Sequence, residues 1–139
     1  MSRLTLQQLL DDARGRIARY DPREVPPEAV LIDLRPSPPQ VIPGSLLIPR
    51  SVLEWRLDPD GDWRSPYAPS LDDEIILLCD HGESSSLAAA TLVAVGFARA
   101  GDVVGGFEAW EAAGLPLVAA PKAEGLPGTG PPVEPGPKT

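Results

Sequence analysis

Short apolar runs alternate with polar and proline-rich segments along most of this chain. Four such runs, rich in Val, Ile and Leu, lie at residues 29–33, 45–49, 74–79 and 103–104. Nearly continuous apolar runs between turn residues are typical of strands that are buried on both faces of a parallel sheet. The run at 74–79, Glu-Ile-Ile-Leu-Leu-Cys, is the strongest strand prediction in the chain.

Three further segments have helical character: residues 5–20, with apolar positions at helical spacing, residues 85–95, rich in Ala, and residues 107–113. Gly96 and Gly114 directly follow the second and third segments, and glycine is common just beyond the end of a helix. Strands that alternate with helices indicate βαβ units. We therefore expect an α/β fold around a mostly parallel sheet.

The length of 139 residues predicts one domain with a single core. We expect residues 1–25 to form a helical lead-in that packs on the domain, and residues 26–120 to form the domain itself. From Pro121 onward the chain consists largely of Pro, Gly and small residues. Such a segment buries too little apolar surface to offset the entropy lost on ordering, so residues 121–139 are expected to be disordered.

Charge and composition narrow the range of partners. The net charge of −8 argues against nucleic acid and anionic membranes, because a protein that binds phosphates needs a basic face. No stretch approaches the ~18 apolar residues of a membrane span, and charges interrupt residues 1–20 where a signal peptide would be apolar. One Cys and one His do not supply a structural zinc site, so neither metal nor cofactor is expected. We expect a cytoplasmic protein with a reduced thiol; the oligomeric state stays open.

The single cysteine, Cys79, lies at the end of the predicted strand 74–79, and a polar loop and a helix follow it. Ligands in open α/β sheets bind at the carboxyl ends of strands, and the first N–H groups of a helix lack partners within it. The N–H groups of residues 80–85 are therefore predicted to converge on the sulfur and to favour the thiolate. Such a thiolate can attack the outer sulfur of a donor, and the same groups would stabilise the resulting persulfide.

The residues around Cys79 have alternative interpretations. Gly82 gives the loop the conformational freedom that a sharp turn needs. Ser84 and Ser85 either donate hydroxyl groups to the sulfur or cap the next helix, which is their commoner role. Cys79 itself could be a small buried hydrophobe, but the polar residues that follow it favour a functional thiol. His81 is expected to line the pocket or face solvent, because persulfide chemistry needs no base.

Four motifs in this order resemble the rhodanese family over about residues 29–118. They are Leu31-Ile32-Asp33-Leu34-Arg35 (Asp-x-Arg), Ile42-Pro43-Gly44-Ser45 (Ile-Pro-Gly-Ala), Cys79 with Gly82 and Ser85 (Cys-x-x-Gly-x-x-Ser), and Gly105-Gly106-Phe107-Glu108-Ala109-Trp110 followed by Gly114-Leu115-Pro116. The resemblance implies a rhodanese-like α/β fold, with a central, mostly parallel sheet flanked by helices on both faces. It also implies a persulfide on Cys79 and sulfur transfer from a small-molecule donor to a thiophilic acceptor.

The cysteine loop departs from the family in its charge. Many members have Arg at the position of Ser84, where it pairs with an anionic donor such as thiosulfate, whereas this loop carries Asp80 and Glu83. Two carboxylates oppose a lowered pKa of the thiol and repel a dianion. Arg35 and Arg50, from neighbouring loops, are the candidates for the missing positive charge. The predicted substrate pocket around catalytic Cys79 comprises Asp80, His81, Gly82, Glu83, Ser84, Ser85, Arg35 and Arg50. Asp33 is expected to bond backbone groups or Arg35.

Two other functions are weighed against sulfur transfer. A cysteine-dependent phosphatase or arsenate reductase needs an arginine at the sixth residue after the cysteine to clamp the oxyanion, and that residue is Ser85. A low-activity or non-enzymatic sulfur carrier or interaction module on the same fold stays open, because a fold does not determine function. The pKa of the thiol and its ability to hold sulfur would distinguish this module from an enzyme.

Overall fold

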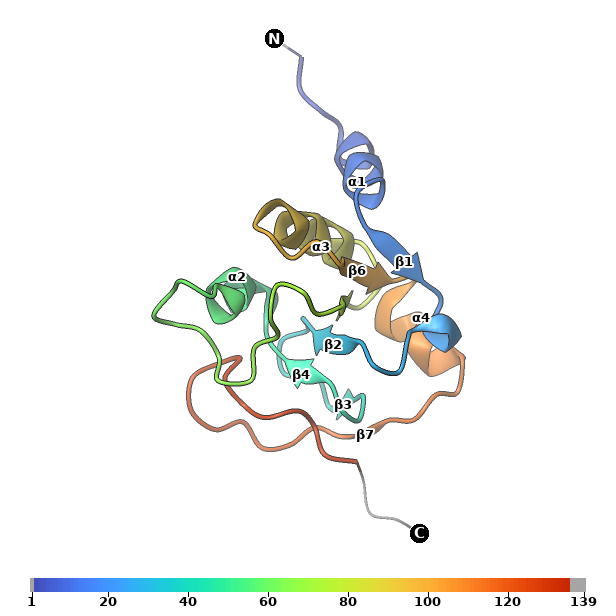
Figure 1. Ribbon diagram of the computed structural model, residues 1–139. Coiled ribbons are helices and arrows are strands. Elements are labelled where there is room, and N and C mark those ends of the chain that lie inside the picture. Colours follow the sequence, from blue (N-terminus) through green and yellow to red (C-terminus); the bar gives the residue numbers. More distant parts are fainter. Residues whose placement is uncertain (1, 136–139) are drawn as a thin grey trace.

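Five short strands form a central parallel sheet in the order β1-β6-β5-β2-β4 (Figure 1). The strands are β1 (Ala18–Tyr20), β2 (Val30–Asp33), β4 (Leu46–Leu47), β5 (Ile75–Leu78) and β6 (Ala100–Val103). Every neighbouring pair in this sheet runs parallel. The computed structural model describes residues 2–135 of the chain. The expected α/β fold around a parallel sheet is confirmed.

The central strand β5 explains why its sequence is apolar without interruption. Successive side chains of a strand point to opposite faces of the sheet. Ile75 and Leu77 lie in one buried cluster, and Ile76 and Leu78 lie in another that contains Trp110. All four β5 side chains are fully buried. A strand covered on both faces needs an apolar residue at every position, which is the pattern that predicted it.

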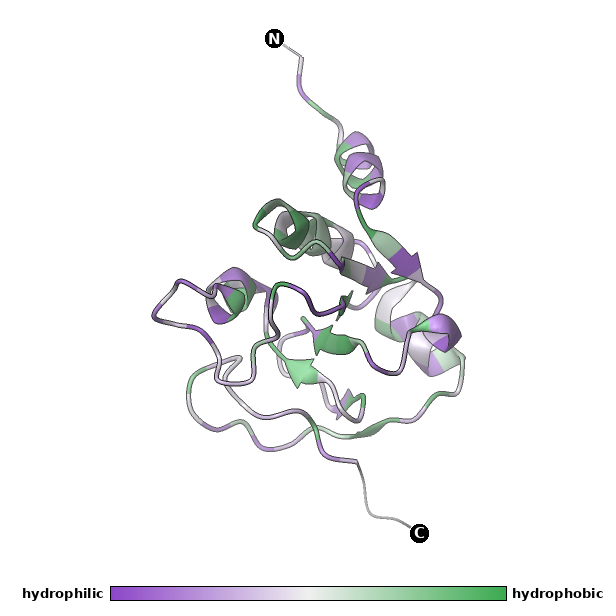
Figure 2. Cartoon of the chain, in the orientation of Figure 1, coloured by the Kyte–Doolittle hydropathy of each residue, from purple (hydrophilic) through white to green (hydrophobic). Residues whose placement is uncertain are grey.

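Helices cover both faces of the sheet (Figure 1). They are α1 (Leu6–Arg14), α2 (Leu53–Leu57), α3 (Ser84–Ala94) and α4 (Gly106–Ala112), with short 3-10 turns at η1 (Pro22–Glu24) and η2 (Arg50–Val52). Residues of α2 and α3 fill the first cluster, whereas α4 contributes Trp110 to the second. Figure 2 shows apolar residues in β2 and β4, whereas α1 carries both polar and apolar residues.

The lead-in differs from the single helix expected over residues 5–20. Helix α1 starts after Thr5, whose hydroxyl accepts a hydrogen bond from the Gln8 amide at 3.1 Å. It ends at Arg14, because the next residue, Gly15, caps it with its amide bonded to the Asp11 carbonyl. Residues 18–20 then pair with β6 and form an edge strand of the sheet. The lead-in thus supplies both a helix and a strand.

The segment from residue 121, which its composition predicts to be disordered, contacts the domain within residues 121–135. The Val133 amide donates to the Ser45 carbonyl at 2.8 Å, and the Gly44 amide donates to the Val133 carbonyl at 2.7 Å. The Arg56 guanidinium binds the Pro127 carbonyl at 2.6 Å. Upstream, β3 (Gln40–Val41) pairs antiparallel with β7 (Val118–Ala119). Through these bonds the segment contacts the domain despite its composition; residues 136–139 lie outside the described residues.

Candidate active site

Cys79 directly follows β5, so its sulfur lies at the carboxyl edge of the sheet, and residues 80–83 connect it to α3. The residue is 7% exposed. It lines an open hollow of about 310 Å³ together with Asp80, His81, Glu83 and Ser84. The sulfur is therefore buried but borders a polar hollow, which differs from the environment of a cysteine that only fills an apolar core.

Three groups of the loop surround the sulfur. The amides of Gly82 and Ser85 donate to Cys79 Sγ at 3.1 and 3.4 Å, and the Ser85 hydroxyl oxygen lies 3.3 Å from Sγ. Gly82 has a φ of +86°, and a Cβ at this position would lie 2.8 Å from the Gly105 amide nitrogen. Only glycine fits both the left-handed backbone and this contact. The predicted convergence of loop amides is confirmed for these two residues.

The hydrogen bonds change the ionisation of the thiol. Burial raises the pKa of Cys79, because it penalises the charged form. The hydroxyls of Ser85 and Ser84 and the amides of Ser85 and Gly82 lower this pKa by hydrogen bonding to the thiolate. Their combined effect is larger, so the pKa of Cys79 lies below its ordinary value. The site therefore favours the nucleophilic form of the sulfur.

The two open interpretations of Ser84 and Ser85 are resolved by the start of α3. Ser84 is the first residue of the helix, and the residue before it, Glu83, makes no side-chain cap. Ser85 is fully buried in the first turn, with its hydroxyl next to the sulfur. Ser85 thus belongs to the site around Cys79 and does not serve as a helix cap.

A buried carboxylate that was not predicted from the sequence lies behind the loop. Asp102 of β6 is fully buried, and its Oδ2 accepts hydrogen bonds from the hydroxyls of Ser85 at 2.7 Å and Ser86 at 2.8 Å. Its Oδ1 accepts from Arg19 Nε at 2.8 Å. An aspartate inside an otherwise apolar strand was the available signal, because a buried carboxylate needs a partner.

Two arginines from the lead-in hold the same loop. Arg14 of α1 and Arg19 of β1 both donate to the Gly82 carbonyl, at 2.8 and 3.0 Å. Arg14 Nε also donates to the Ser86 hydroxyl at 3.1 Å. The positive charges beside the cysteine loop therefore come from the N-terminal elements, and neither arginine was predicted to belong to the site.

The two arginines that were predicted as substrate contacts are not among the residues that line the hollow. Arg35 forms a buried ion pair with Asp33 at 2.8 Å, and its guanidinium lies 3.6 Å from the centre of the Phe107 ring. The expected bond between Asp33 and Arg35 is confirmed. Arg50 pairs with Glu54 at 2.8 Å on the surface. Each predicted contributor thus has a carboxylate partner of its own.

The rim of the hollow is acidic. Asp80 and Glu83 line it, and the exposed His81 places its Nδ1 2.7 Å from Oε2 of Glu108 on α4. His81 therefore pairs with a carboxylate and makes no described contact with the sulfur.

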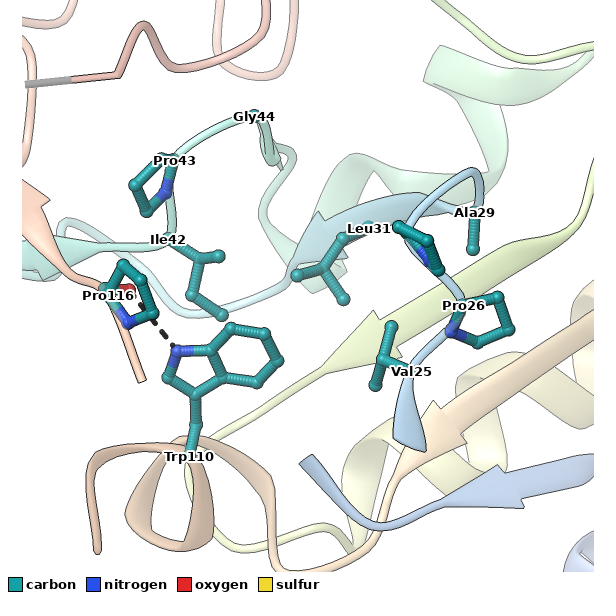
Figure 3. Close-up of a pocket in the computed structure, with 10 residues that line it drawn as sticks. Val25, Pro26, Ala29, Leu31, Ile42, Pro43, Gly44, Trp110 and Pro116 are labelled. Atoms are coloured by element: carbon teal, nitrogen blue, oxygen red, sulfur yellow. Dashed lines mark hydrogen bonds between the residues drawn. The ribbon is translucent and has the colours of Figure 1, made fainter. Parts of the chain in front are cut away.

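A second hollow, of about 280 Å³, lies at the start of β2 beside α4 (Figure 3). Its lining is apolar: Val25, Pro26, Pro27, Ala29, Leu31, Ile42, Pro43, Gly44, Trp110 and Pro116. Trp110 Nε1 donates to the Pro116 carbonyl at 3.4 Å, which satisfies the indole. None of these lining residues carries a nucleophile or a charge, so the chemistry lies at Cys79.

The structure places a cysteine bound by two amides at the carboxyl end of the central strand of a parallel α/β sheet. The family model for the rhodanese-like domain matches residues 11–113, and the chain belongs to this family. This confirms the resemblance that the four sequence motifs indicated.

Two curated relatives are named sulfurtransferases. Thiosulfate sulfurtransferase GlpE of Actinobacillus succinogenes is 40% identical over 57 residues, which are 41% of this chain and 50% of that protein. Adenylyltransferase and sulfurtransferase MOCS3 of Arabidopsis thaliana is 32% identical over 113 residues, covering 72% of this chain and 24% of that protein. The matched region thus spans half or less of either relative.

Solved structures show the same fold. RPA3614 of Rhodopseudomonas palustris, a protein of unknown function described as a possible tyrosine phosphatase, matches with a TM-score of 0.75 and 27% identity over 85% of this chain and 97% of that one. The human single-domain sulfurtransferase TSTD1 matches with a TM-score of 0.53 and 27% identity over 61% and 82%. Within the described residues, no helix combines the length and apolar character needed to cross a bilayer.

Proposed function

We propose that this protein is a sulfurtransferase that forms a persulfide on Cys79 and passes the outer sulfur to a thiophilic acceptor. The observation that supports this most directly is the position of Cys79 Sγ, with the Gly82 and Ser85 amides as donors at 3.1 and 3.4 Å. The names of the relatives GlpE, MOCS3 and TSTD1 agree with this class of reaction.

The reaction has two displacement steps. The Cys79 thiolate attacks the outer sulfur of the donor, and a new Sγ–S bond forms as the donor's bond to that sulfur breaks. The bonding electron pair leaves with the donor fragment, which is sulfite from thiosulfate or a thiolate from a persulfide. An acceptor nucleophile then attacks the outer sulfur, and the Cys79 thiolate leaves with the electron pair. The two loop amides stabilise the negative sulfur at the start and end of the cycle.

The setting of the reaction follows from the single cysteine. A chain with one cysteine has no second thiol to convert the persulfide into an internal disulfide. The outer sulfur therefore stays available to an external acceptor. We place the reaction in the cytoplasm, because a reducing compartment keeps a single thiol free. The donor and acceptor are small molecules in this proposal, and no cofactor takes part in either displacement.

The acidic rim selects the charge of the donor. Asp80 and Glu83 line the hollow, and His81 is paired with Glu108, so a dianion meets net negative charge there. Arg35, which could have offset this charge, pairs with Asp33. We therefore expect neutral or singly charged donors to load Cys79 faster than thiosulfate does.

Intact-mass spectrometry tests the proposed function. The protein is incubated with thiosulfate, 3-mercaptopyruvate or a low-molecular-weight persulfide, and free thiol is then trapped with iodoacetamide. We expect a mass gain of one sulfur that is lost in Cys79→Ser, with thiosulfate the slowest donor. If no donor adds sulfur to Cys79, the proposal is wrong and the interaction module becomes the better interpretation.

Phosphatase chemistry is the alternative that the description of RPA3614 raises. An oxyanion clamp needs an arginine in the loop, but the corresponding residue is Ser85, which contacts the sulfur and Asp102. Arg14 and Arg19 donate to the Gly82 carbonyl from outside the loop. We expect no Cys79-dependent hydrolysis of an aryl phosphate, which a chromogenic assay against Cys79→Ser would measure.

A further inference from the structure

The hydroxyl of Ser85 lies between two groups that compete for it. Its Oγ is 2.7 Å from Asp102 Oδ2 and 3.3 Å from Cys79 Sγ. A serine hydroxyl has one hydrogen, and a carboxylate can only accept. The short bond to Asp102 therefore uses that hydrogen, and the contact with the sulfur is one in which the Cys79 thiol donates to Ser85. The arrangement described by the structure is that of the protonated cysteine.

Ionisation of Cys79 changes the acceptor to which the Ser85 hydroxyl donates its hydrogen. A thiolate has no hydrogen to donate, so two groups with only lone pairs would face each other unless the Ser85 hydrogen turns toward the sulfur. Asp102 can release this hydrogen, because it keeps Arg19 at 2.8 and 3.3 Å and the Ser86 hydroxyl at 2.8 Å. The thiolate then gains this hydroxyl as a donor in addition to the amides of Gly82 and Ser85.

We propose that Asp102 is a positioning residue that controls the ionisation of Cys79 through the Ser85 hydroxyl, an inference that rests on the proposed function of Cys79. Asp102 holds the hydroxyl in the thiol state and releases it to the sulfur in the thiolate state. A persulfide carries its charge on the outer sulfur, which would have to extend into the hollow and away from Asp102, because the fully buried Ser85 and Asp102 occupy the other side of Sγ. The carboxylate therefore opposes the persulfide less than the thiolate, and it favours the loaded form of the protein.

Charged groups from several elements face this site. They are Asp80, His81 and Glu83 of the loop, Asp102 of β6, Arg19 of β1, Arg14 of α1 and Glu108 of α4. Among the described residues, Asp102 alone connects to the sulfur through a hydroxyl that bonds both. The effect of an Asp102 substitution on Cys79 that is transmitted through Ser85 can therefore be distinguished from the effect of the other charges on the ionisation of Cys79.

A double-mutant cycle tests the inference. The rate of iodoacetamide alkylation of Cys79 is measured against pH in wild type, Ser85→Ala, Asp102→Asn and the double variant. Ser85→Ala removes a donor and should raise the pKa of Cys79 by about one unit. In Asp102→Asn the amide NH₂ donates to Ser85, whose hydrogen then turns to the sulfur. This pKa should fall by about one unit, a roughly tenfold gain in thiolate at low pH.

The effect of Asp102→Asn in the Ser85→Ala variant shows whether Asp102 acts through the Ser85 hydroxyl. In Ser85→Ala, the Asp102→Asn change should alter the low-pH alkylation rate by less than about twofold. A structural role alone would loosen the loop in both single variants and raise the pKa of Cys79 in each. The inference is overturned if Asp102→Asn leaves this pKa unchanged or raises it, or if its effect is equal in both backgrounds. Alkylation needs no sulfur donor, so this outcome is independent of whether Cys79 takes up sulfur.

Two further measurements control for folding. Asp33→Asn alters the other buried Asp–Arg pair, which has no described hydroxyl link to Cys79, and should leave the alkylation profile unchanged. If Asp102→Asn does not fold, carbon-13 NMR of the wild-type protein replaces it. The Asp102 carboxyl signal should shift with the same midpoint as Cys79, and this shift should be absent in Ser85→Ala. The inference is overturned if the chemical shift of the Asp102 carboxyl carbon does not change as Cys79 titrates.

Discussion

Two aspartate–arginine pairs with fully buried carboxylates lie on the strands that flank β5, and they have different consequences. Asp33 and Arg35 are two residues apart, and Arg35 also donates to the Gln40 carbonyl at 2.9 Å and stacks on the Phe107 ring. Asp102 and Arg19 come from β6 and β1, and Asp102 contacts the sulfur site through Ser85. The chemistry of the two pairs is the same, but within residues 2–135 only Asp102 bonds a hydroxyl that contacts the Cys79 sulfur. The groups that a buried ion pair contacts therefore determine whether it affects only the stability of the fold or also the reactivity of the cysteine.

Replacing Arg35 or Arg19 with methionine should give the largest difference between the two ion pairs in stability and in Cys79 reactivity. Arg35→Met leaves the buried Asp33 unpaired and should reduce the free energy of unfolding by about 3–5 kcal/mol. Arg19 is partly exposed, with 21% of its side chain accessible, so Arg19→Met should cost less, about 1–3 kcal/mol. Denaturant unfolding measures both. Alkylation of Cys79 at neutral pH should slow only in Arg19→Met, and equal slowing in both variants would contradict the distinction.

Gly82→Ala tests whether the backbone conformation of the cysteine loop is needed for stability and for the lowered pKa of Cys79. Arg14 and Arg19 both donate to the carbonyl of this residue. The new Cβ would lie 2.8 Å from the Gly105 nitrogen on a backbone with φ of +86°. We expect a loss of about 1–3 kcal/mol in the free energy of unfolding, and a rise in the pKa of Cys79 as its amide donor moves. Gly44→Ala is a matched control, because Gly44 also has a positive φ but nothing lies within 4 Å of its Cβ. It should strain the backbone without changing alkylation.

The difference in stability between wild type and Cys79→Ser should depend on pH through the ionisation of Cys79. The pKa of Cys79 is lowered in the folded protein, so folding stabilises the thiolate relative to the thiol. Wild type should gain stability over Cys79→Ser as pH rises from the folded pKa to the unfolded one. The gain is complete above the unfolded pKa and is lost as pH falls through the folded pKa. We expect about 1.4 kcal/mol for each unit that separates the two values. Thermal unfolding across this range measures the difference.

The smallest effect concerns the acidic rim. Ser84→Arg should raise the rate of thiosulfate loading about threefold, because an exposed charge contact contributes less than about 1 kcal/mol. Ser84→Ala is the control, since it removes the hydroxyl without adding charge. Loading from a neutral donor should not increase in Ser84→Arg. A variant no faster than wild type with thiosulfate would show that the charge of the rim does not select the donor.

The part of the site that the sequence predicted is local in the chain. The apolar run of β5, the glycine in the loop and the start of α3 lie within a few residues of Cys79, and their pattern follows from strand burial and helix geometry. The pairing of Asp33 with Arg35 is also local and was expected. These features depend on neighbours in sequence, so their physical causes can be read from the residues themselves.

The part that was missed depends on the order of strands. Asp102, Arg19 and Arg14 meet the cysteine loop because β6 lies between β5 and β1, and because α1 packs on α3. Composition carries no information about such pairings. The contacts of residues 121–135 with the domain were missed for a related reason, since they include backbone bonds to distant residues such as Ser45. The apolar content of a segment does not predict those bonds.

The two guanidinium groups on the Gly82 carbonyl also bear on where this domain begins. A shortened chain that started at residue 26 would keep Cys79, the whole loop and all four sequence motifs. It would nevertheless lose one edge of the sheet and leave Asp102 buried without its cation. Anyone who trims this protein, or transplants its cysteine loop into another scaffold, has to carry the first twenty or so residues along.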